Sequence, residues 1–146
     1  MYLDYHQLLK KYKAAESNYY DALDKKSKLL YSVMPHAIEV KEVVMHLSNT
    51  VSDTKLIDYA SKIDEVDNLI NQTRNTRDML AYELKKMECL IKNSVDIKDK
   101  IYYYKWIKRM TPYKFHKLVG YSRPQVYRII SEIKKILYEN NKSETK

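Results

Sequence analysis

One segment sets the architecture of the C-terminal third of this chain: Thr111-Pro-Tyr-Lys-Phe-His-Lys-Leu-Val-Gly-Tyr-Ser-Arg-Pro-Gln-Val-Tyr-Arg-Ile-Ile130. Thr111 has the side chain of a helix N-cap and is followed by a proline at the first helical position. Ser122 is a second N-cap, and Gln125 stands three residues later, which is the spacing of a capping box. The segment therefore predicts two short helices that begin at residues 112 and 123.

The only glycine of the chain, Gly120, lies between the two predicted helices. A sharp turn that needs a positive φ favours glycine at this place, so the pair predicts a helix-turn-helix. The apolar residues that recur at helical spacing are expected to face inward: Phe115, Leu118, Val119, Tyr121, Val126, Ile129, Ile130 and Ile133. The residues expected to face outward are cations, amides and phenols: Lys114, Lys117, Arg123, Gln125, Tyr127, Arg128 and Lys134.

The positive charge of the chain is concentrated around this segment. The formal net charge is +8, from 27 Lys and Arg and 19 Asp and Glu. Residues 97–146 carry 13 cations and 4 acids, whereas residues 1–96 carry 14 and 15. A basic patch confined to one element is the electrostatic pattern of nucleic-acid binding, because neutralising phosphates releases counterions.

Two long segments show the alternating three and four spacing of coiled-coil seams. The first seam comprises Tyr5, Leu8, Tyr12, Ala15, Tyr19, Ala22, Lys26, Leu29 and Val33. The second comprises Leu56, Tyr59, Ile63, Val66, Ile70, Thr73, Arg77, Leu80, Leu84, Met87 and Ile91. These seams predict helices of about residues 2–34 and 53–93. The second would be on the order of 60 Å long. A helix of this length cannot fold back on itself, so it must pair with another helix.

The economical arrangement is an antiparallel pair joined by a linker of about residues 35–52, whose pattern fits either a short helix or a mixed structure. The spacing does not decide whether the pair closes within one chain or between two. Polar seam positions such as Lys26, Thr73 and Arg77 often fix register or oligomeric state, which favours a dimer, although they can also lie at the edge of the seam. The residues expected to form the oligomerisation seam are Ile63, Val66, Ile70, Leu80, Leu84 and Met87.

A further helix over residues 96–110 is expected to support the helix-turn-helix, with Ile97, Ile101, Tyr104 and Ile107 or Lys108 on its apolar face and Tyr102, Tyr103 and Trp106 on others. The predicted fold is all-α, because one glycine and three prolines leave little with which to make β-turns. The predicted domains are a coiled-coil region over residues 1–94, a helix-turn-helix domain over 95–138 and a solvated tail over 139–146.

Composition argues against several classes of protein. No apolar run approaches a membrane span and the first residues do not resemble a signal peptide, so a cytoplasmic, nucleoid-associated protein is expected. The single Cys89 is interpreted as structural. The four histidines are at least ten residues apart, and neither a glycine-rich phosphate loop nor a catalytic triad can be identified, so we expect no metal, no cofactor and no enzyme activity.

The stretch from Trp106-Ile-Lys-Arg-Met-Thr111 through Gly120-Tyr-Ser122 to Gln125-Val-Tyr-Arg128 resembles the C-terminal region of phage and prophage regulators of late transcription. These are the RinA, ArpU and LtrC type proteins, whose helix-turn-helix is similar to region four of bacterial sigma factors. The specific motif covers about residues 100–137, and the N-terminal layout is similar only in organisation. The resemblance implies a sequence-specific activator of phage or mobile-element genes that contacts host RNA polymerase.

The expected target is double-stranded DNA, with the helix that begins at Arg123 in the major groove. The residues expected to read bases are Arg123, Gln125, Tyr127 and Arg128, although Gln125 can instead close the capping box. The residues expected to contact phosphates are Thr111, Tyr113, Lys114, Lys117, Ser122, Lys134 and Lys135, although such lysines also occur on ordinary solvated faces.

Two other functions fit the same organisation. A DNA-packaging protein similar to a small terminase subunit also joins a helix-turn-helix to assembly helices, and it would form rings. A coiled-coil adaptor would bind a protein partner and would show little salt-dependent DNA binding. The exposed seam of a regulator could also receive a protein antagonist.

Overall fold

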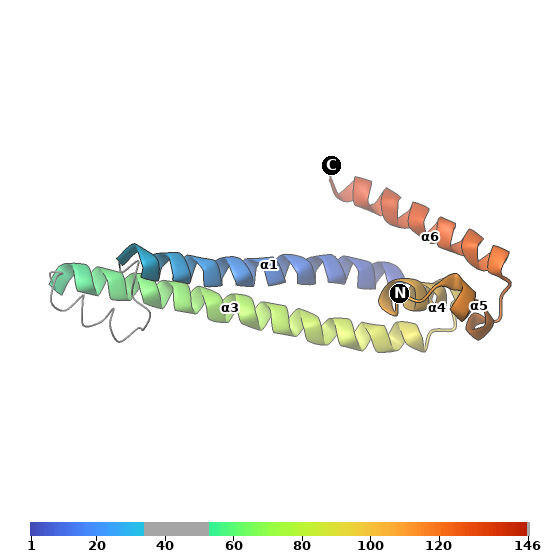
Figure 1. The fold of residues 1–146 in the computed structure, drawn as a ribbon, viewed down its shortest axis with the longest axis horizontal. Coiled ribbons are helices and arrows are strands. Elements are labelled where there is room, and N and C mark those ends of the chain that lie inside the picture. The colour runs from blue at the N-terminus through green and yellow to red at the C-terminus, as the bar shows by residue number, and fades with distance from the viewer. Residues whose placement is uncertain (34–52, 146) are drawn as a thin grey trace. The chain divides into compact units, whose positions relative to one another are not determined.

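The computed structural model describes residues 1–33 and 53–145, and within them the chain is α-helical without a strand (Figure 1). The elements are α1 (Tyr2–Val33), α3 (Asp53–Lys92), α4 (Ile97–Tyr102), the π-helical turn η1 (Tyr103–Ile107), α5 (Pro112–Val119) and α6 (Arg123–Glu144). The all-α prediction is confirmed for these residues. The predicted linker of residues 35–52 lies outside the described residues. No helix of the described ranges is both long enough and apolar enough to span a membrane.

The chain divides into two compact units, one formed by Lys11–Leu80 and the other by Met1–Lys10 together with Ala81–Lys146. This division differs from the sequence boundary at residue 94. The first turns of α1 and the last turns of α3 belong with the C-terminal helices, because aromatic side chains of α1 pack on α4. Both long helices therefore run through the two units.

Within the unit Lys11–Leu80, α1 and α3 run side by side in opposite directions (Figure 1). Lys26 Nζ of α1 lies 2.6 Å from Asp67 Oδ1 of α3. Seven residues earlier in α1, the ring of Tyr19 lies 4.2 Å from the guanidinium carbon of Arg77. An earlier residue of α1 thus meets a later residue of α3, and these contacts join helices of one chain.

The predicted seam positions whose side chains are described are all buried or half-buried. Ala15, Ala22 and Ile70 are the most enclosed of them in this unit. The side chains of Val33 and Leu56 lie outside the described residues. A stripe at alternating three and four spacing therefore marks the less exposed side of both helices, as hydrophobic burial requires.

The three polar seam residues have partners within this chain. Lys26 pairs with Asp67, and Arg77 lies over Tyr19 and also contacts the carboxylate of Asp78 at 2.8 Å. The hydroxyl of Thr73 donates to the carbonyl of Leu69 at 2.8 Å, one turn earlier in the same helix. These side chains can therefore occupy the seam without leaving an unpaired polar group.

The other unit is built around Tyr102, the last residue of α4, whose side chain is 1% exposed. Its ring centroid lies 5.4 Å from that of Tyr2, 6.0 Å from that of Tyr5 and 5.2 Å from that of Trp106. Its hydroxyl is 3.2 Å from Nδ1 of His6. Burial raises the pKa of this phenol above its ordinary value, because the phenolate would lose its hydration. The cluster attaches the first turns of α1 to α4 and η1.

On the predicted apolar face of residues 96–110, Ile101 is buried, and Ile97, Tyr104 and Ile107 are half-buried. Tyr102 and Tyr103, which were expected on other faces, are buried as well. Tyr102 is buried because Tyr2 and Tyr5 of α1 pack against its ring, which the spacing within one helix cannot show. The segment also ends in a widened turn. The N–H of Lys108 donates to the carbonyl of Tyr103, five residues earlier, at 2.9 Å, which is the hydrogen bond of a π-helix. A wider turn changes the angle between successive side chains, so a spacing argument based on 3.6 residues per turn fails there.

Helix α6 also departs from the sequence prediction, because it continues to Glu144 through most of the segment expected to be a solvated tail. Glu144 Oε2 lies 2.8 Å from Nζ of Lys10 in α1, and the same ammonium group donates to Asn141. The sequence carries no local signal for this pairing, because the partners are more than 130 residues apart.

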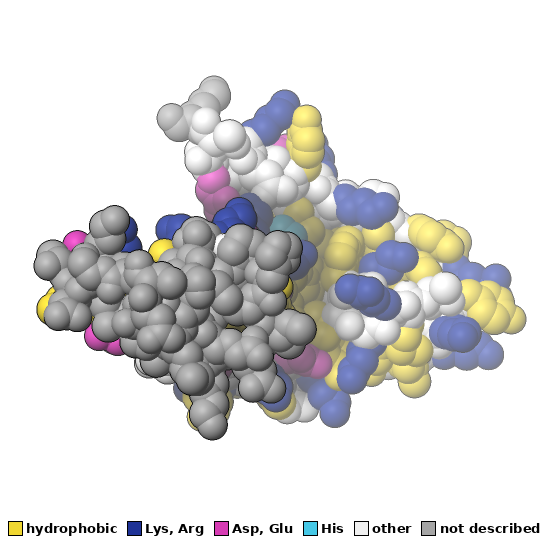
Figure 2. All heavy atoms as spheres, turned by 60° about the vertical axis from the view of Figure 1, so that its left-hand side comes forward, with side chains coloured by type: hydrophobic (Ala, Val, Ile, Leu, Met, Phe, Trp, Pro, Cys, Tyr) yellow, Lys and Arg dark blue, Asp and Glu magenta, His cyan; other side chains and the backbone are white. Residues whose placement is uncertain are grey.

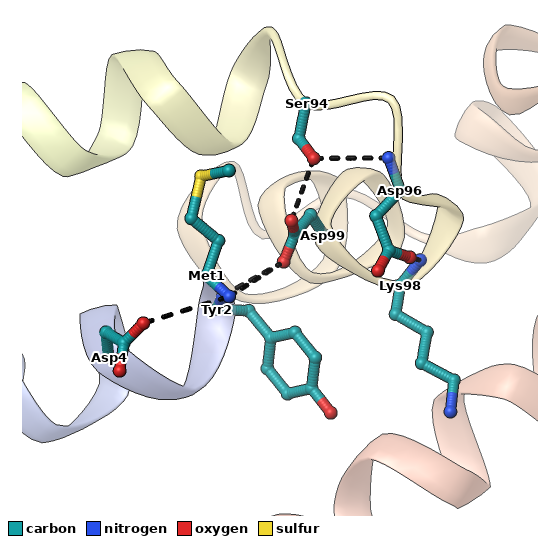
Figure 3. A network of polar contacts seen from close by, with 7 residues as sticks. All are labelled: Met1, Tyr2, Asp4, Ser94, Asp96, Lys98 and Asp99. Atoms are coloured by element: carbon teal, nitrogen blue, oxygen red, sulfur yellow. Dashed lines mark hydrogen bonds and ion pairs between the residues drawn. The ribbon is translucent and has the colours of Figure 1, made fainter.

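A buried carboxylate organises the start of α4 (Figure 3). Asp99 Oδ1 accepts the backbone N–H of Tyr2 at 2.9 Å, and its Oδ2 accepts the hydroxyl of Ser94 at 2.8 Å. The oxygen of Ser94 in turn accepts the N–H of Asp96, whose own carboxylate caps α4 by accepting the N–H of Lys98. This network joins the start of α1 to the loop between α3 and α4.

Replacement of Asp99 by alanine is expected to lower the free energy of unfolding by about 1–3 kcal/mol, because the N–H of Tyr2 loses its buried acceptor. Asp99→Asn keeps an acceptor oxygen for this N–H and should cost clearly less. Urea unfolding followed by circular dichroism measures both. Equal losses for the two variants would show that the hydrogen bond to Tyr2 is not what Asp99 contributes.

Candidate nucleic-acid interface

Helices α5 and α6 pack against each other and against α4, and each of the two buries one face. Phe115 of α5 and Val126 and Ile133 of α6 are fully buried, and Ile129 and Ile130 are nearly so. Tyr104 stacks on Phe115 with ring centroids 5.7 Å apart, so η1 supplies part of the packing. Burial of these five predicted inward residues is confirmed.

Two of the predicted inward residues are instead exposed. Leu118 is 63% exposed and Tyr121 is 39% exposed, whereas Val119 is half-buried. Helix α5 is only eight residues long, and its buried residues are Pro112 and Phe115, both in its first half. Leu118 lies in the last turn of the helix, on a side that the packed surface does not reach.

The turn between the helices is closed by a Schellman motif, in which the chain reverses through a left-handed residue. Gly120 has φ 76°, its N–H donates to the carbonyl of Lys117, and the next N–H, of Tyr121, donates to the carbonyl of His116. A Cβ at Gly120 would meet no atom within 4 Å, so the backbone conformation, and not lack of space, favours glycine. The ring nitrogen Nδ1 of His116 lies 3.2 Å from the carbonyl oxygen of Tyr121, which adds a side-chain contact across the turn.

The N-termini of the two helices are capped differently. Thr111 precedes α5 in an extended conformation, and its side chain makes no capping hydrogen bond. Ser122 precedes α6, and Gln125 Oε1 accepts both its N–H at 3.1 Å and its hydroxyl at 2.9 Å. Bidentate pairing of a glutamine with adenine needs the same oxygen. In this geometry, base contact by Gln125 therefore competes with the capping box.

The outer face of α5 and α6 is cationic. The side chains of Lys114, Lys117, Arg123, Gln125, Tyr127, Arg128 and Lys134 are exposed, as predicted. From Thr111 to Ser131 the chain has four Lys and Arg side chains and no Asp or Glu. Lysine and arginine side chains are interleaved with hydrophobic ones, tyrosines included, on the right-hand side of the molecule in Figure 2. An anion that approached this face would meet no carboxylate from those residues.

The two arginines of α6 each have a neighbour that orients them. The guanidinium carbon of Arg123 lies 4.1 Å from the centroid of the Tyr113 ring. Nε of Arg128 lies 3.9 Å from Glu132 Oε1, one turn later in α6. The other carboxylate oxygen of Glu132 lies 3.5 Å from Nζ of Lys98 in α4, so part of its charge is already paired. Neither Tyr113 nor Glu132 was expected to contact an arginine.

The sequence reasoning also missed cations before α5. Arg109 is exposed and has φ 54°, a left-handed conformation that is unusual for a residue other than glycine. Lys108 is exposed beside it, and its ammonium group lies 5.6 Å from the centroid of the Tyr103 ring. Two adjacent cations at a turn are a signal that spacing rules for helices do not use.

Four further residues predicted to contact phosphates are exposed: Thr111 and Ser122 just before the two helices, Tyr113 in the first turn of α5 and Lys135 on α6. In the predicted oligomerisation seam, Ile70 and Leu84 are buried, and Ile63, Val66, Leu80 and Met87 are half-buried. In the part of the chain that the structure describes, no group of three or more histidine, cysteine or acidic residues could hold a metal ion.

Comparison of the chain with protein-family models, curated proteins and solved structures finds no match.

Proposed function

We propose that this protein is a sequence-specific regulator of transcription that binds double-stranded DNA through a helix-turn-helix formed by α5 and α6. One observation carries the proposal: the segment from Thr111 to Ser131 exposes cations and tyrosines, contains no acid and is packed by the apolar residues of the same two helices. A cationic face without acids favours binding to DNA, because each phosphate that a lysine or arginine neutralises releases counterions.

In this proposal the first turns of α6 lie in the major groove. The positive end of the helix dipole at Ser122 favours phosphate there. Arg123 and Arg128 are the proposed base readers, since a guanidinium can pair bidentately with guanine. Lys114, Lys117, Lys134 and Lys135 are the proposed phosphate contacts, which position the helix without specifying sequence.

The proposed biological role follows the resemblance of residues 106–129 to the phage and prophage late-transcription regulators. On that basis the protein activates phage or mobile-element genes, contacts host RNA polymerase and acts as a dimer in the bacterial nucleoid. The contacts between α1 and α3 within one chain support an antiparallel pair as the rod of this regulator. A dimer would then use surfaces outside that pairing or exchange the helices between copies.

Selection of DNA from a random duplex library with the purified full chain tests this function, with the mass of the free and bound protein measured in the same buffer. We expect one enriched motif and a dimer on it. Absence of any bound duplex at low salt would reject the proposal. Binding as a closed ring would favour the DNA-packaging function, and a partner protein bound without DNA would favour the adaptor.

The role of Lys117 gives a separate prediction. Lys117→Ala is expected to weaken binding to selected and unrelated duplexes by the same factor, and to lower the slope of log K against log salt by about 0.9, because one phosphate contact is lost. Fluorescence anisotropy between low and moderate salt measures the slope. Lys62→Ala, at an exposed position of α3, removes the same charge and should leave the slope unchanged. A slope that both variants change equally would indicate only a loss of net charge.

A further inference from the structure

On their outer face, α5 and α6 are joined by a contact between an aromatic ring and a cation. Tyr113 is the second residue of α5, and Arg123 is the first residue of α6. The guanidinium carbon lies 4.1 Å from the ring centroid, well inside the distance at which a cation is attracted to the face of an aromatic ring. Both side chains are exposed, so burial alone does not hold them together.

A stacked guanidinium has properties that a free one lacks. Stacking uses the flat face of the group and leaves its edge, with the N–H donors, free to pair with two acceptors in one plane. The ring also limits the rotamers of a long side chain before any ligand arrives, so less conformational entropy is lost on binding. Arg128 has a carboxylate neighbour instead of a ring, with its Nε 3.9 Å from Glu132 Oε1.

We propose that Tyr113 is a positioning residue that presents the edge of Arg123 to guanine in the major groove, and that it acts through its ring and not through its hydroxyl. This inference rests on the proposed DNA-binding function. It replaces the sequence expectation that Tyr113 contacts phosphate, for which the hydroxyl would be the donor. It also assigns to the stacked pair, and not to Arg123 alone, the discrimination at one base pair of the operator.

The test compares Tyr113→Phe with Tyr113→Leu in the full chain, on the duplex selected from the library and on versions with each base pair changed. Tyr113→Leu should weaken binding to the selected duplex about two- to fivefold, since exposed cation–π contacts contribute about 0.5–1 kcal/mol. The loss should fall on the same base pair that Arg123→Ala affects. Tyr113→Phe keeps a ring and should retain the affinity and preference of the parent protein. The double variant Tyr113→Leu/Arg123→Ala should bind no more weakly than Arg123→Ala.

A measurement without DNA completes the test. In the free protein, the ring current of Tyr113 should shift the NMR signals of the Arg123 side chain, and the shift should persist in Tyr113→Phe and vanish in Tyr113→Leu. An unshifted parent spectrum would overturn the inference whatever the DNA result. Equal losses in the Phe and Leu variants would overturn it in favour of a hydroxyl contact with phosphate. If Tyr113→Leu keeps full preference while Arg123→Ala loses it, the inference fails and the proposed function stands. If the parent protein binds no duplex, both fail.

Discussion

Replacement of Tyr102 by alanine is expected to lower the free energy of unfolding by about 3–5 kcal/mol, the range for removal of a large aromatic side chain from a packed core. The residue is almost wholly enclosed, and its ring has neighbours from α1 and from η1. The neighbouring rings cannot fill the space without moving the helices that carry them. The loss should therefore also loosen the first turns of α1 from the C-terminal helices.

Urea or guanidinium unfolding followed by circular dichroism measures this effect, and two variants control it. Tyr102→Phe removes only the hydroxyl near His6 and should cost about 1 kcal/mol, the usual net value of one hydrogen bond. Tyr82→Ala, at a side chain of α3 that is 71% exposed, should change the free energy by no more than about 0.5 kcal/mol. A Tyr102→Ala protein as stable as Tyr82→Ala would mean that the aromatic cluster does not hold this unit together.

The helices that sequence reasoning located well are those governed by local rules. The predicted spans of about 2–34 and 53–93 differ by one residue from α1 and α3 at their C-terminal ends. Their seams follow from a spacing that repeats over many turns, so an error at one position does not change the pattern. The capping box at Ser122 and the turn at Gly120 were equally accessible, because each depends on residues within one turn of itself. Thr111 stands at the predicted N-cap position, but its side chain makes no capping hydrogen bond.

Features that depend on contacts distant in sequence could not be predicted from these rules. The neighbours of Tyr102 in α1 stand about a hundred residues earlier, and Asp99 meets the backbone of Tyr2 across a separation of 97. Tyr103 is buried at the first position of the π-helical turn, and no residue type is a marker for such a turn. Exposure of Leu118 depends on how far around α5 the packed surface extends, and helical spacing gives the direction of a side chain but not that limit.

In the candidate interface, too, the local features could be predicted and the contacts with other elements could not. Exposure of Arg123, Tyr127 and Arg128 could be predicted, because these residues lie away from the apolar stripe of α6. The contacts that orient the two arginines could not. The partner of Arg123 is on another helix, and the direction of a long side chain is not contained in its spacing. The sequence left open whether Gln125 caps α6 or reads a base. In the structure, its oxygen accepts both hydrogen bonds from Ser122 and therefore takes part in the cap.

Replacement of Arg128 by alanine is expected to weaken binding to the selected duplex by about 1–3 kcal/mol, or roughly five- to 150-fold, and to remove the preference at one base pair. The side chain is 75% exposed, so the substitution should not disturb packing. Discrimination requires that the guanidinium pair with two acceptors of one base, which alanine cannot do. Anisotropy titrations against the duplex and its single-base variants measure both the loss and its position.

Arg128→Lys separates base reading from charge. Lysine keeps the positive charge near Glu132 but lacks the planar pair of donors, so it should restore most of the binding to unrelated duplexes without restoring the base preference. Glu132→Gln gives the complementary comparison. Removing the carboxylate should raise affinity for all duplexes, since one like-charged group near the phosphates is lost. If Arg128→Ala instead weakens all sequences by the same factor and lysine restores them fully, Arg128 contacts phosphate, and the reading of sequence must be assigned to Arg123 and its stacked tyrosine.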